Sequence, residues 1–315
     1  MSETRIETAR NLLRDCLGVQ AGESLVVVAD DSRRDLADSL YEAGRRLGAE
    51  TVLAVMGERS RSGEEPPAAV ADAMAAAAAV VCVTRHSLTH TQARKRAAAA
   101  GARVATMPGI TEDMFSQGAI TADYGRVREL TERVTARLSD VSEVRVEKNG
   151  RSLSFSVAGR DGVPSTGLYL NPGESGNLPS GEAYIAPVEG RGGGEILVDG
   201  SIAGIGALEA PVLLRIEDGR LVAAEGLEGA RLLEILGGGE GRTLAEFGIG
   251  TNDKARITGV VLEDEKVYGT IHIAFGSNHT FGGTVDAGVH IDCVVKEPDV
   301  YFDGKPVIRA GEWID

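Results

Sequence analysis

Most of the few histidines of this chain gather near its C-terminus. Three of its five histidines, His272, His279 and His290, fall there, and Asp292 follows the last of them by two positions. Side chains at i and i+2 of a β-strand project from the same face. The apolar residues that alternate with His290 and Asp292 favour a strand, which would present an imidazole and a carboxylate side by side. Such a pair can hold a metal ion, or act as a base with its orienting acid.

Three further segments supply side chains of the same kind. Glu182 follows a Pro-Ser-Gly turn, Glu246 precedes a Gly-Ile-Gly stretch that we expect to form a turn, and His272 lies within a strand-like run. Each taken alone is more typical of a surface, capping or hydrogen-bonded core residue. Together with His290 and Asp292, however, they form a mixed imidazole and carboxylate set that suits Zn²⁺, Mn²⁺, Co²⁺ or Fe²⁺. The set is large enough for two divalent ions that share a carboxylate.

Two kinds of fold must position these residues. Up to about residue 138, apolar runs typical of buried strands (25–29, 51–56, 80–83 and 103–106) alternate with helical patterns. This alternation predicts an α/β domain with an open parallel sheet and helices on both faces. The second half has frequent glycine, short strand-like runs and one clear helix at 227–236. We therefore expect an α/β, Rossmann-like domain over residues 1–140 and a β-rich domain over 141–315 that carries the metal site.

Composition argues against several classes of function. The formal net charge is −14, which disfavours nucleic acid and anionic membrane surfaces as partners, because phosphate binding depends mostly on cations. The N-terminus does not resemble a signal peptide, and the longest apolar stretch is too short to span a bilayer. We expect Cys16, Cys82 and Cys293 to be reduced thiols of a cytoplasmic protein. The first half lacks the glycine-rich motifs of nucleotide sites, and His86 and His90 are expected on its surface or in its loops.

Four segments of the chain, in order, resemble the M29 family of metallo-aminopeptidases, the aminopeptidase T family: NLPSGEAYIAP, LAEFGIGTN, GTIHIAFG and HIDCVV. The likeness covers most of residues 140–315. It implies an N-terminal α/β domain, a β-rich domain with a two-metal site, and a homodimer. Carried over by motif, Glu182, Glu246, His272, His290 and Asp292 fall on the metal-ligand positions of the family. The implied activity is release of N-terminal residues from peptides by a water that two Zn, Co or Mn ions activate.

One loop departs from the pattern of that family, and the chain is also shorter than its peptidases. His279 takes roughly the position of a tyrosine thought to assist catalysis there. A histidine at this position could donate to an oxyanion, act as a general acid or base, or bind metal. In the hydrolase hypothesis, Glu182 or Glu246 would take the proton of the attacking water.

Two other hypotheses remain open. Ring-cleaving dihydroxypyridine dioxygenases resemble relatives that share the fold of the M29 peptidases. A mononuclear Fe(II) enzyme of that kind needs two histidines and one carboxylate as ligands. His290 and Asp292 with either His272 or His279 could supply them. A non-enzymatic metal-binding relative is the other alternative. Retention of both glutamates of the ligand set favours the hydrolase, acting on a small peptide or another small molecule.

Overall fold

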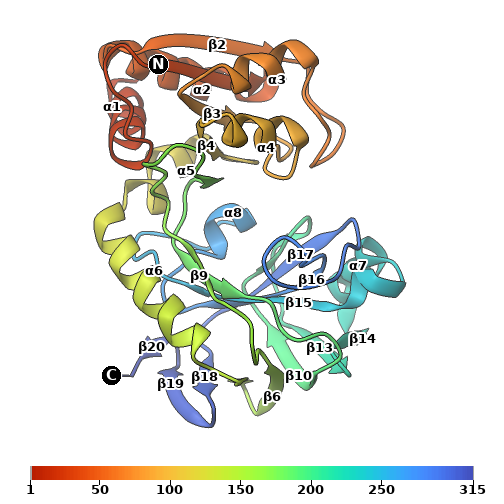
Figure 1. Cartoon of the computed structure of the whole chain (residues 1–315). Helices are drawn as coiled ribbons and strands as arrows, with labels where there is room; N and C mark the ends of the chain where they lie inside the picture. Colours follow the sequence, from red (N-terminus) through yellow and green to blue (C-terminus); the bar gives the residue numbers. More distant parts are fainter. Residues whose placement is uncertain (1, 315) are drawn as a thin grey trace. The chain divides into compact units, whose positions relative to one another are not determined.

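The computed structural model describes residues 2–314, which form two compact units (Figure 1). The first unit comprises the chain up to Gly125 together with Gly167–Ser180. The second comprises Arg126–Thr166 together with the chain from Gly181 onward. The division predicted at residue 140 therefore differs from the observed one, because the chain enters the second unit at Arg126 and then returns once to the first.

The first unit contains the predicted open parallel sheet. Its described strands lie in the order β2-β1-β3-β4-β8, and every pairing is parallel. The predicted strands are present as β1 (Ser24–Asp30), β2 (Glu50–Met56), β3 (Ala79–Val83) and β4 (Arg103–Thr106). The strand β8 (Ser175–Asn177) was not predicted, since three residues of the sequence Ser-Gly-Asn carry no apolar pattern.

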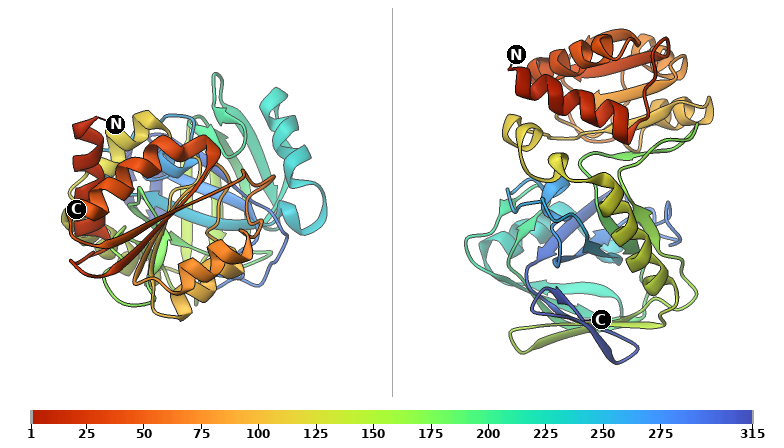
Figure 2. Two further views of the ribbon diagram at one scale, coloured as in Figure 1. Left: turned by 90° about the horizontal axis from the view of Figure 1, so that it is seen from above. Right: turned by 90° about the vertical axis from the view of Figure 1, so that its left-hand side faces the viewer.

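Helices cover both faces of this sheet (Figure 2). On one face Val26 and Val28 share an apolar cluster with α3 (Ala68–Ala75) and α4 (Gln92–Ala99). On the other face Leu25 lies against Gly44 of α2 (Arg34–Arg46), which packs with α1 (Glu3–Asn11). Burial on both faces explains why the strands read as continuous apolar runs. The short elements of the unit are η1 (Leu12–Cys16), η2 (Asp31–Arg33), α5 (Glu112–Ser116) and η3 (Gly118–Thr121).

The second unit, as described, consists of two antiparallel sheets around a shared apolar core. The ligand sheet, named for the residues it carries, has the order β12-β11-β17-β16-β15-β9-β7. Its strands are β7 (Val163–Ser165), β9 (Glu182–Ile185), β11 (Ser201–Ile202), β12 (Gly206–Ala207), β15 (Leu244–Gly250), β16 (Ile271–Gly276) and β17 (His290–Val295). Phe247 and Ile273 of this sheet join the same core cluster as Val144 and Ile196 of the other.

The other sheet has the order β14-β13-β10-β6-β5-β18-β19-β20. Its strands are β5 (Glu143–Lys148), β6 (Arg151–Ser156), β10 (Gly192–Val198), β13 (Val212–Glu217), β14 (Arg220–Ala224), β18 (Asp299–Phe302), β19 (Lys305–Arg309) and β20 (Glu312–Trp313). The helix α7 (Gly226–Leu236) was predicted within a residue, and α6 (Tyr124–Ser139) is the other long helix of this part of the chain. Each contributes leucines to the core. The remaining short helices are α8 (Val261–Asp264) and η4 (Gly239–Arg242).

The central strands of the ligand sheet have one apolar and one polar face. The apolar face packs into the core through Phe247, Ile249, Ile271, Ile273, Ile291 and Cys293. Side chains alternate along each strand, and the register pairs His272 with Gly248 and Asp292 with Ala274. Glu182, Glu246, His272, His290 and Asp292 must therefore project from the opposite face. The fold thus places every predicted ligand on one surface and turns Cys293 into the core, away from Asp292.

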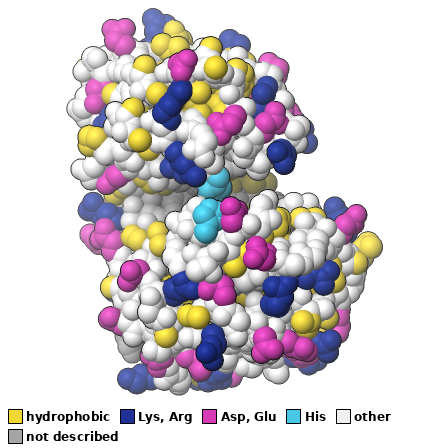
Figure 3. Space-filling view, turned by 45° about the vertical axis from the view of Figure 1, so that its right-hand side comes forward, with side chains coloured by type: hydrophobic (Ala, Val, Ile, Leu, Met, Phe, Trp, Pro, Cys, Tyr) yellow, Lys and Arg dark blue, Asp and Glu magenta, His cyan; other side chains and the backbone are white. Residues whose placement is uncertain are grey.

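Four further features of the described residues bear on the sequence analysis. Acidic and basic side chains are interspersed on the face shown in Figure 3. The three cysteines are buried and free. His86 and His90 lie in the loop that follows β3. Among the residues that the structure describes, no helix is both long enough and apolar enough to cross a membrane.

Candidate metal centre

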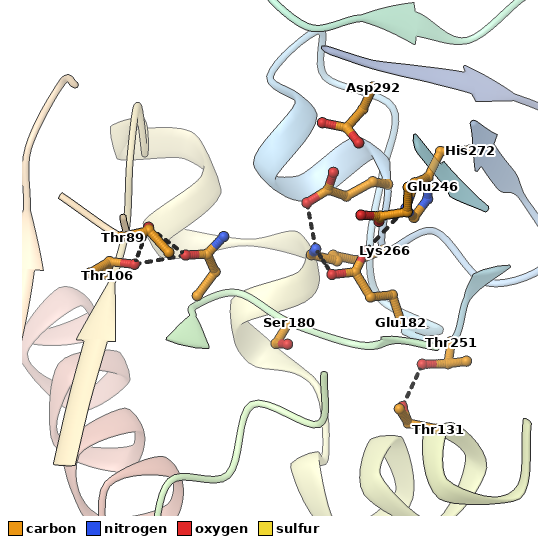
Figure 4. Close-up of polar contacts among 12 residues, drawn as sticks. Thr89, Thr106, Thr131, Ser180, Glu182, Glu246, Thr251, Lys266, His272 and Asp292 are labelled. Carbon is orange, nitrogen blue, oxygen red and sulfur yellow. Dashed lines mark hydrogen bonds and ion pairs between the residues drawn. The ribbon is translucent and has the colours of Figure 1, made fainter. Parts of the chain in front are cut away.

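The five predicted ligands meet on the polar face of the ligand sheet. Figure 4 shows Glu182, Glu246, His272 and Asp292 converging, with Lys266 among them. His272 Nε2 lies 3.1 Å from Glu246 Oε1, and His290 Nε2 lies 3.5 Å from Glu246 Oε2. Glu246 therefore stands between the two imidazoles, with one oxygen toward each.

Side chains able to bind a metal form two groups within the described part of the chain. The His290 group consists of Glu246, His290 and Asp292, and the His272 group of Glu182, Glu265 and His272. Within each group the candidate ligand atoms lie within 4.8 Å of one another. His290 Nε2 is 3.3 Å from Asp292 Oδ1, and His272 Nε2 is 3.5 Å from Glu182 Oε2. Glu246 joins the two groups into one centre.

Two glycines of β15 make this convergence possible. The Gly-Ile-Gly stretch after Glu246 is not the turn we predicted but part of the strand itself. A Cβ atom at Gly248 would overlap the ring of His272 on the neighbouring strand. A Cβ at Gly250 would overlap the carbonyl group of Val267. The two glycines therefore let a ligand ring and a backbone segment approach the strand closely.

Sequence reasoning missed two buried charged residues of the centre. Glu265 and Lys266 end a run of four charged residues, Glu263–Lys266, and such a run normally indicates a solvated surface. All four are buried, and Lys266 is fully so. The Lys266 ammonium donates to Glu182 Oε1 at 2.5 Å and to Glu265. The one nearby hint in the sequence is Gly250, because only a residue without a side chain leaves room for the backbone of this segment. A glycine alone, however, does not show which segment packs against it.

The pairing accounts for the burial of these charges. An ionised group in an apolar interior is tolerated only when it is paired and hydrogen-bonded. Burial would lower the pKa of Lys266, but the charges and hydrogen bonds of Glu182 and Glu265 raise it instead. Burial raises the pKa of Glu265 to about 8 although Lys266 opposes this. Lys266 is therefore a permanent cation at this position.

The carboxylates also make the two imidazoles basic. Burial opposes protonation of His272, but its hydrogen bond to Glu246 and the charge of Glu182 outweigh burial and raise its pKa to about 9. Burial likewise opposes protonation of His290, and the charges of Asp292 and Glu246 raise its pKa to about 10. A field that attracts protons so strongly also attracts metal cations, which bind the same nitrogen atoms and release those protons.

The donor set fits a divalent metal ion on three observations. His290 Nδ1 lies 2.8 Å from the Ser277 carbonyl oxygen, so that Nδ1–H can donate there and leave Nε2 for a metal. Glu182 Oε2 is buried, faces His272 Nε2 at 3.5 Å and has no hydrogen-bond partner among the described residues. Glu182, Glu246 and Asp292 bring three carboxylates, and Glu265 a carboxyl group that burial keeps largely protonated near neutral pH, to a centre in which Lys266 is the one permanent cation of the described contacts. A divalent ion would offset most of the remaining negative charge.

His279 belongs to neither group of candidate ligands. Its Nδ1 lies 3.2 Å from the Val285 carbonyl oxygen, and its side chain is 44% exposed. The loop of residues 277–289 that carries it is tied to the body of the unit, because Asn278 Nδ2 and Thr284 N each donate to Glu189 Oε1 at 2.9 Å. The suggested role of His279 as a further metal ligand gains no support from this geometry, whereas its role in proton transfer stays a prediction.

Comparison with known proteins separates fold from function. A family model described as "NicX: 2,5-dihydroxypyridine 5,6-dioxygenase" matches residues 5–315. A solved 2,5-dihydroxypyridine dioxygenase from Pseudomonas putida KT2440 has a TM-score of 0.81 at 18% identity, covering 100% of this chain and 98% of that one. Wild-type AmpT from Thermus thermophilus has a TM-score of 0.72 at 19% identity, covering 99% of both chains. At such identities the two structures show the fold alone. No curated protein matches the chain.

These findings confirm the predicted fold and correct the predicted activity. The likeness to AmpT supports an M29-like fold. The expected metallo-aminopeptidase or other hydrolase of the M29 type is wrong as the main function, because the matching family model describes a dioxygenase. The expected pair of Zn, Co or Mn ions is not confirmed, although groups of metal-binding side chains are present. The hydrolase hypothesis had relied on Glu182 and Glu246 as metal ligands, yet Glu182 forms an ion pair with the buried Lys266.

Proposed function

Because the chain belongs to the NicX family of 2,5-dihydroxypyridine 5,6-dioxygenases, which its model matches over residues 5–315, we propose that it is a ring-cleaving dioxygenase. Its substrate would be a dihydroxylated pyridine or a close analogue, and both atoms of O₂ would enter the product as a ring bond breaks. The observation that carries the proposal is the presence of two imidazoles and a carboxylate, His272, His290 and Asp292, on one face of the ligand sheet. Non-haem iron oxygenases use this ligand set and leave positions open for O₂ and substrate.

Fe(II) would be held by His290 and Asp292, which form one candidate group with Glu246, and by His272, whose Nε2 contacts the same Glu246. When bound, it would supply the redox chemistry that O₂ requires for reaction with an aromatic ring. Glu246 makes the two imidazoles converge, since its oxygens contact both Nε2 atoms. The Ser277 carbonyl group fixes the orientation of the His290 ring from its other nitrogen.

The loop of residues 277–289 would provide the substrate side of the site. Phe281 lies edge-on to His290, with ring centroids 6.0 Å apart, and edge-on to Tyr184 at 5.3 Å. These rings offer an apolar wall next to the polar face of the sheet, which suits a flat aromatic substrate with hydroxyl groups. In the tautomer in which His279 Nδ1–H donates to the Val285 carbonyl group, Nε2 is free to accept a proton from a substrate hydroxyl.

The proposed function is tested by oxygen uptake. Protein reconstituted with Fe(II) and given 2,5-dihydroxypyridine in air should consume O₂ and bleach the ring absorbance. A chelator should stop both, Fe(II) should restore them, and Zn²⁺ should not. Iron-loaded protein that consumes no O₂ with a panel of dihydroxylated pyridines and benzenes would rule the proposal out. An aminoacyl anilide given to the same protein should not be hydrolysed.

His279→Gln is expected to lower kcat by about 10²- to 10⁴-fold, the usual contribution of a general base, while iron content stays at the wild-type level. Glutamine keeps polarity and approximate size but cannot take up the proton. Turnover and metal content of the same preparation check this, with Thr280→Ala, also exposed in the same loop, as the control that should retain turnover. A variant that loses iron together with activity would make His279 a ligand and not a base.

A further inference from the structure

The Lys266 ammonium is bonded to the two glutamates, Glu182 and Glu265, that a second metal ion would need as ligands. We propose that Lys266 replaces a second metal ion in the His272 group, so that the centre binds a single ion, in the His290 group joined by His272. The inference deepens the proposed function and rests on it for the presence of a metal. It assigns Lys266 as a positioning residue that sets the number of ions the centre holds.

The contacts of Lys266 show what it occupies. Its ammonium lies 2.5 Å from Glu182 Oε1 and also forms an ion pair with Glu265. These are the two carboxylates of the His272 group. A divalent ion there would have to share both with a positive charge at hydrogen-bond distance, and like charges at such a separation in a buried site repel strongly. The ammonium and the ion are therefore alternatives for the same pair of glutamates.

The two groups differ in the cations that face them. In the His290 group, the described ion pairs of Glu246 and Asp292 are all with imidazoles. Among the residues that the structure describes, no Lys or Arg forms an ion pair with either carboxylate. Because the imidazoles become neutral when they bind a metal, this group would keep two uncompensated carboxylates. The His290 group is therefore the one whose negative charge a divalent cation would neutralise.

Lys266 cannot leave its position without rearrangement of the backbone. Its side chain is fully buried. Its N–H donates to the Glu263 carbonyl oxygen at 2.9 Å, and its own carbonyl accepts from the Asn252 N–H at 2.9 Å. The backbone of this segment also packs directly onto Gly250, where no side chain would fit. The ammonium is thus built into the fold, unlike a surface lysine that could swing aside for an ion.

The number of bound ions tests the inference directly and without any assay of turnover. The full chain would be equilibrated with Mn²⁺ alone and, separately, with Zn²⁺ alone, desalted, and analysed for metal per chain. We expect one ion for the wild type and two for Lys266→Ala, which frees both glutamates and leaves space for an ion. Lys148→Ala is the matched control, because Lys148 is also a largely buried lysine in the second unit, paired with Asp199 at 3.2 Å. It should stay at one ion.

A second variant decides the matter if Lys266→Ala does not fold. Glu265→Gln leaves Lys266 paired with Glu182 and removes one candidate ligand of the His272 group. It should keep one ion with unchanged affinity, whereas loss of the ion would overturn the inference. A wild type that binds two ions, or a folded Lys266→Ala that still binds one, would overturn it as well. A wild type with one ion and no ring cleavage would defeat the proposed function and leave this inference intact.

Discussion

Asp292→Ala is expected to strip the centre of iron and to lower ring-cleaving turnover by more than about 100-fold, beyond the loss that removal of a supporting partner of a ligand usually causes. Asp292 lies on the same strand as His290, with Oδ1 at 3.3 Å from His290 Nε2. In the alanine variant the two imidazoles would have to bind the iron without this carboxylate. Metal analysis after reconstitution with Fe(II), together with initial rates of O₂ uptake, measures both effects.

The control for this prediction is another strand aspartate of the second unit. Asp299 of β18 pairs with Arg309 at 3.0 Å and belongs to neither metal-binding group. Asp299→Ala should therefore keep its iron and its turnover even if thermal stability falls slightly. Full metal content and turnover in Asp292→Ala would show that Asp292 is not a ligand, and would leave Glu246 as the carboxylate that completes the set.

Gly248→Ala is expected to weaken iron binding although it alters no ligand. The added methyl group would overlap the ring of His272, so either the ring leaves its position or β15 and β16 separate. Overpacking of a close-packed interior typically costs about 1–3 kcal/mol of stability. A displaced imidazole should weaken metal affinity by about 10- to 100-fold or more. Titration of the folded variant with Fe(II) under anaerobic conditions, and its thermal midpoint, check the two effects.

Gly193→Ala is the matched control for that substitution. Gly193 also lies in a strand, β10, but a Cβ atom there would meet just the Ile216 carbonyl oxygen at 3.4 Å, an ordinary contact. The variant should bind iron like the wild type. If Gly248→Ala bound iron as tightly as Gly193→Ala, the close approach of the His272 ring would not be needed for the metal centre.

Most of the fold, and the position of the five candidate ligands on one face of a sheet, could be predicted from the sequence for one reason. Alternation along β17 and the continuous apolar runs of β1 and β3 follow from burial, which acts residue by residue. Lys266 and Glu265 could not be found in this way, because their burial depends on partners such as Glu182 that are distant in the sequence. The same holds for β8, which is a strand because β4 offers it an edge.

The reaction was predicted wrongly for a different reason. Imidazole and carboxylate ligands suit several divalent metals, and ligand types alone do not determine how many ions bind or what they do. In our proposal the residue that sets the number of ions is Lys266, which lies outside the motifs that carried the resemblance. The homodimer expected from that resemblance stays a prediction.

The return of the chain to its first unit at Gly167–Ser180 has a consequence for synthesis on the ribosome. Until β8 has been synthesised and has paired with β4, the edge of β4 is open to pairing with other chains. Meanwhile β5 and β6 emerge before β18, the C-terminal neighbour of β5 in its sheet. Neither unit can complete its sheets before the other has begun, so nascent chains interrupted between residues 126 and 174 should be especially prone to aggregation and dependent on chaperones.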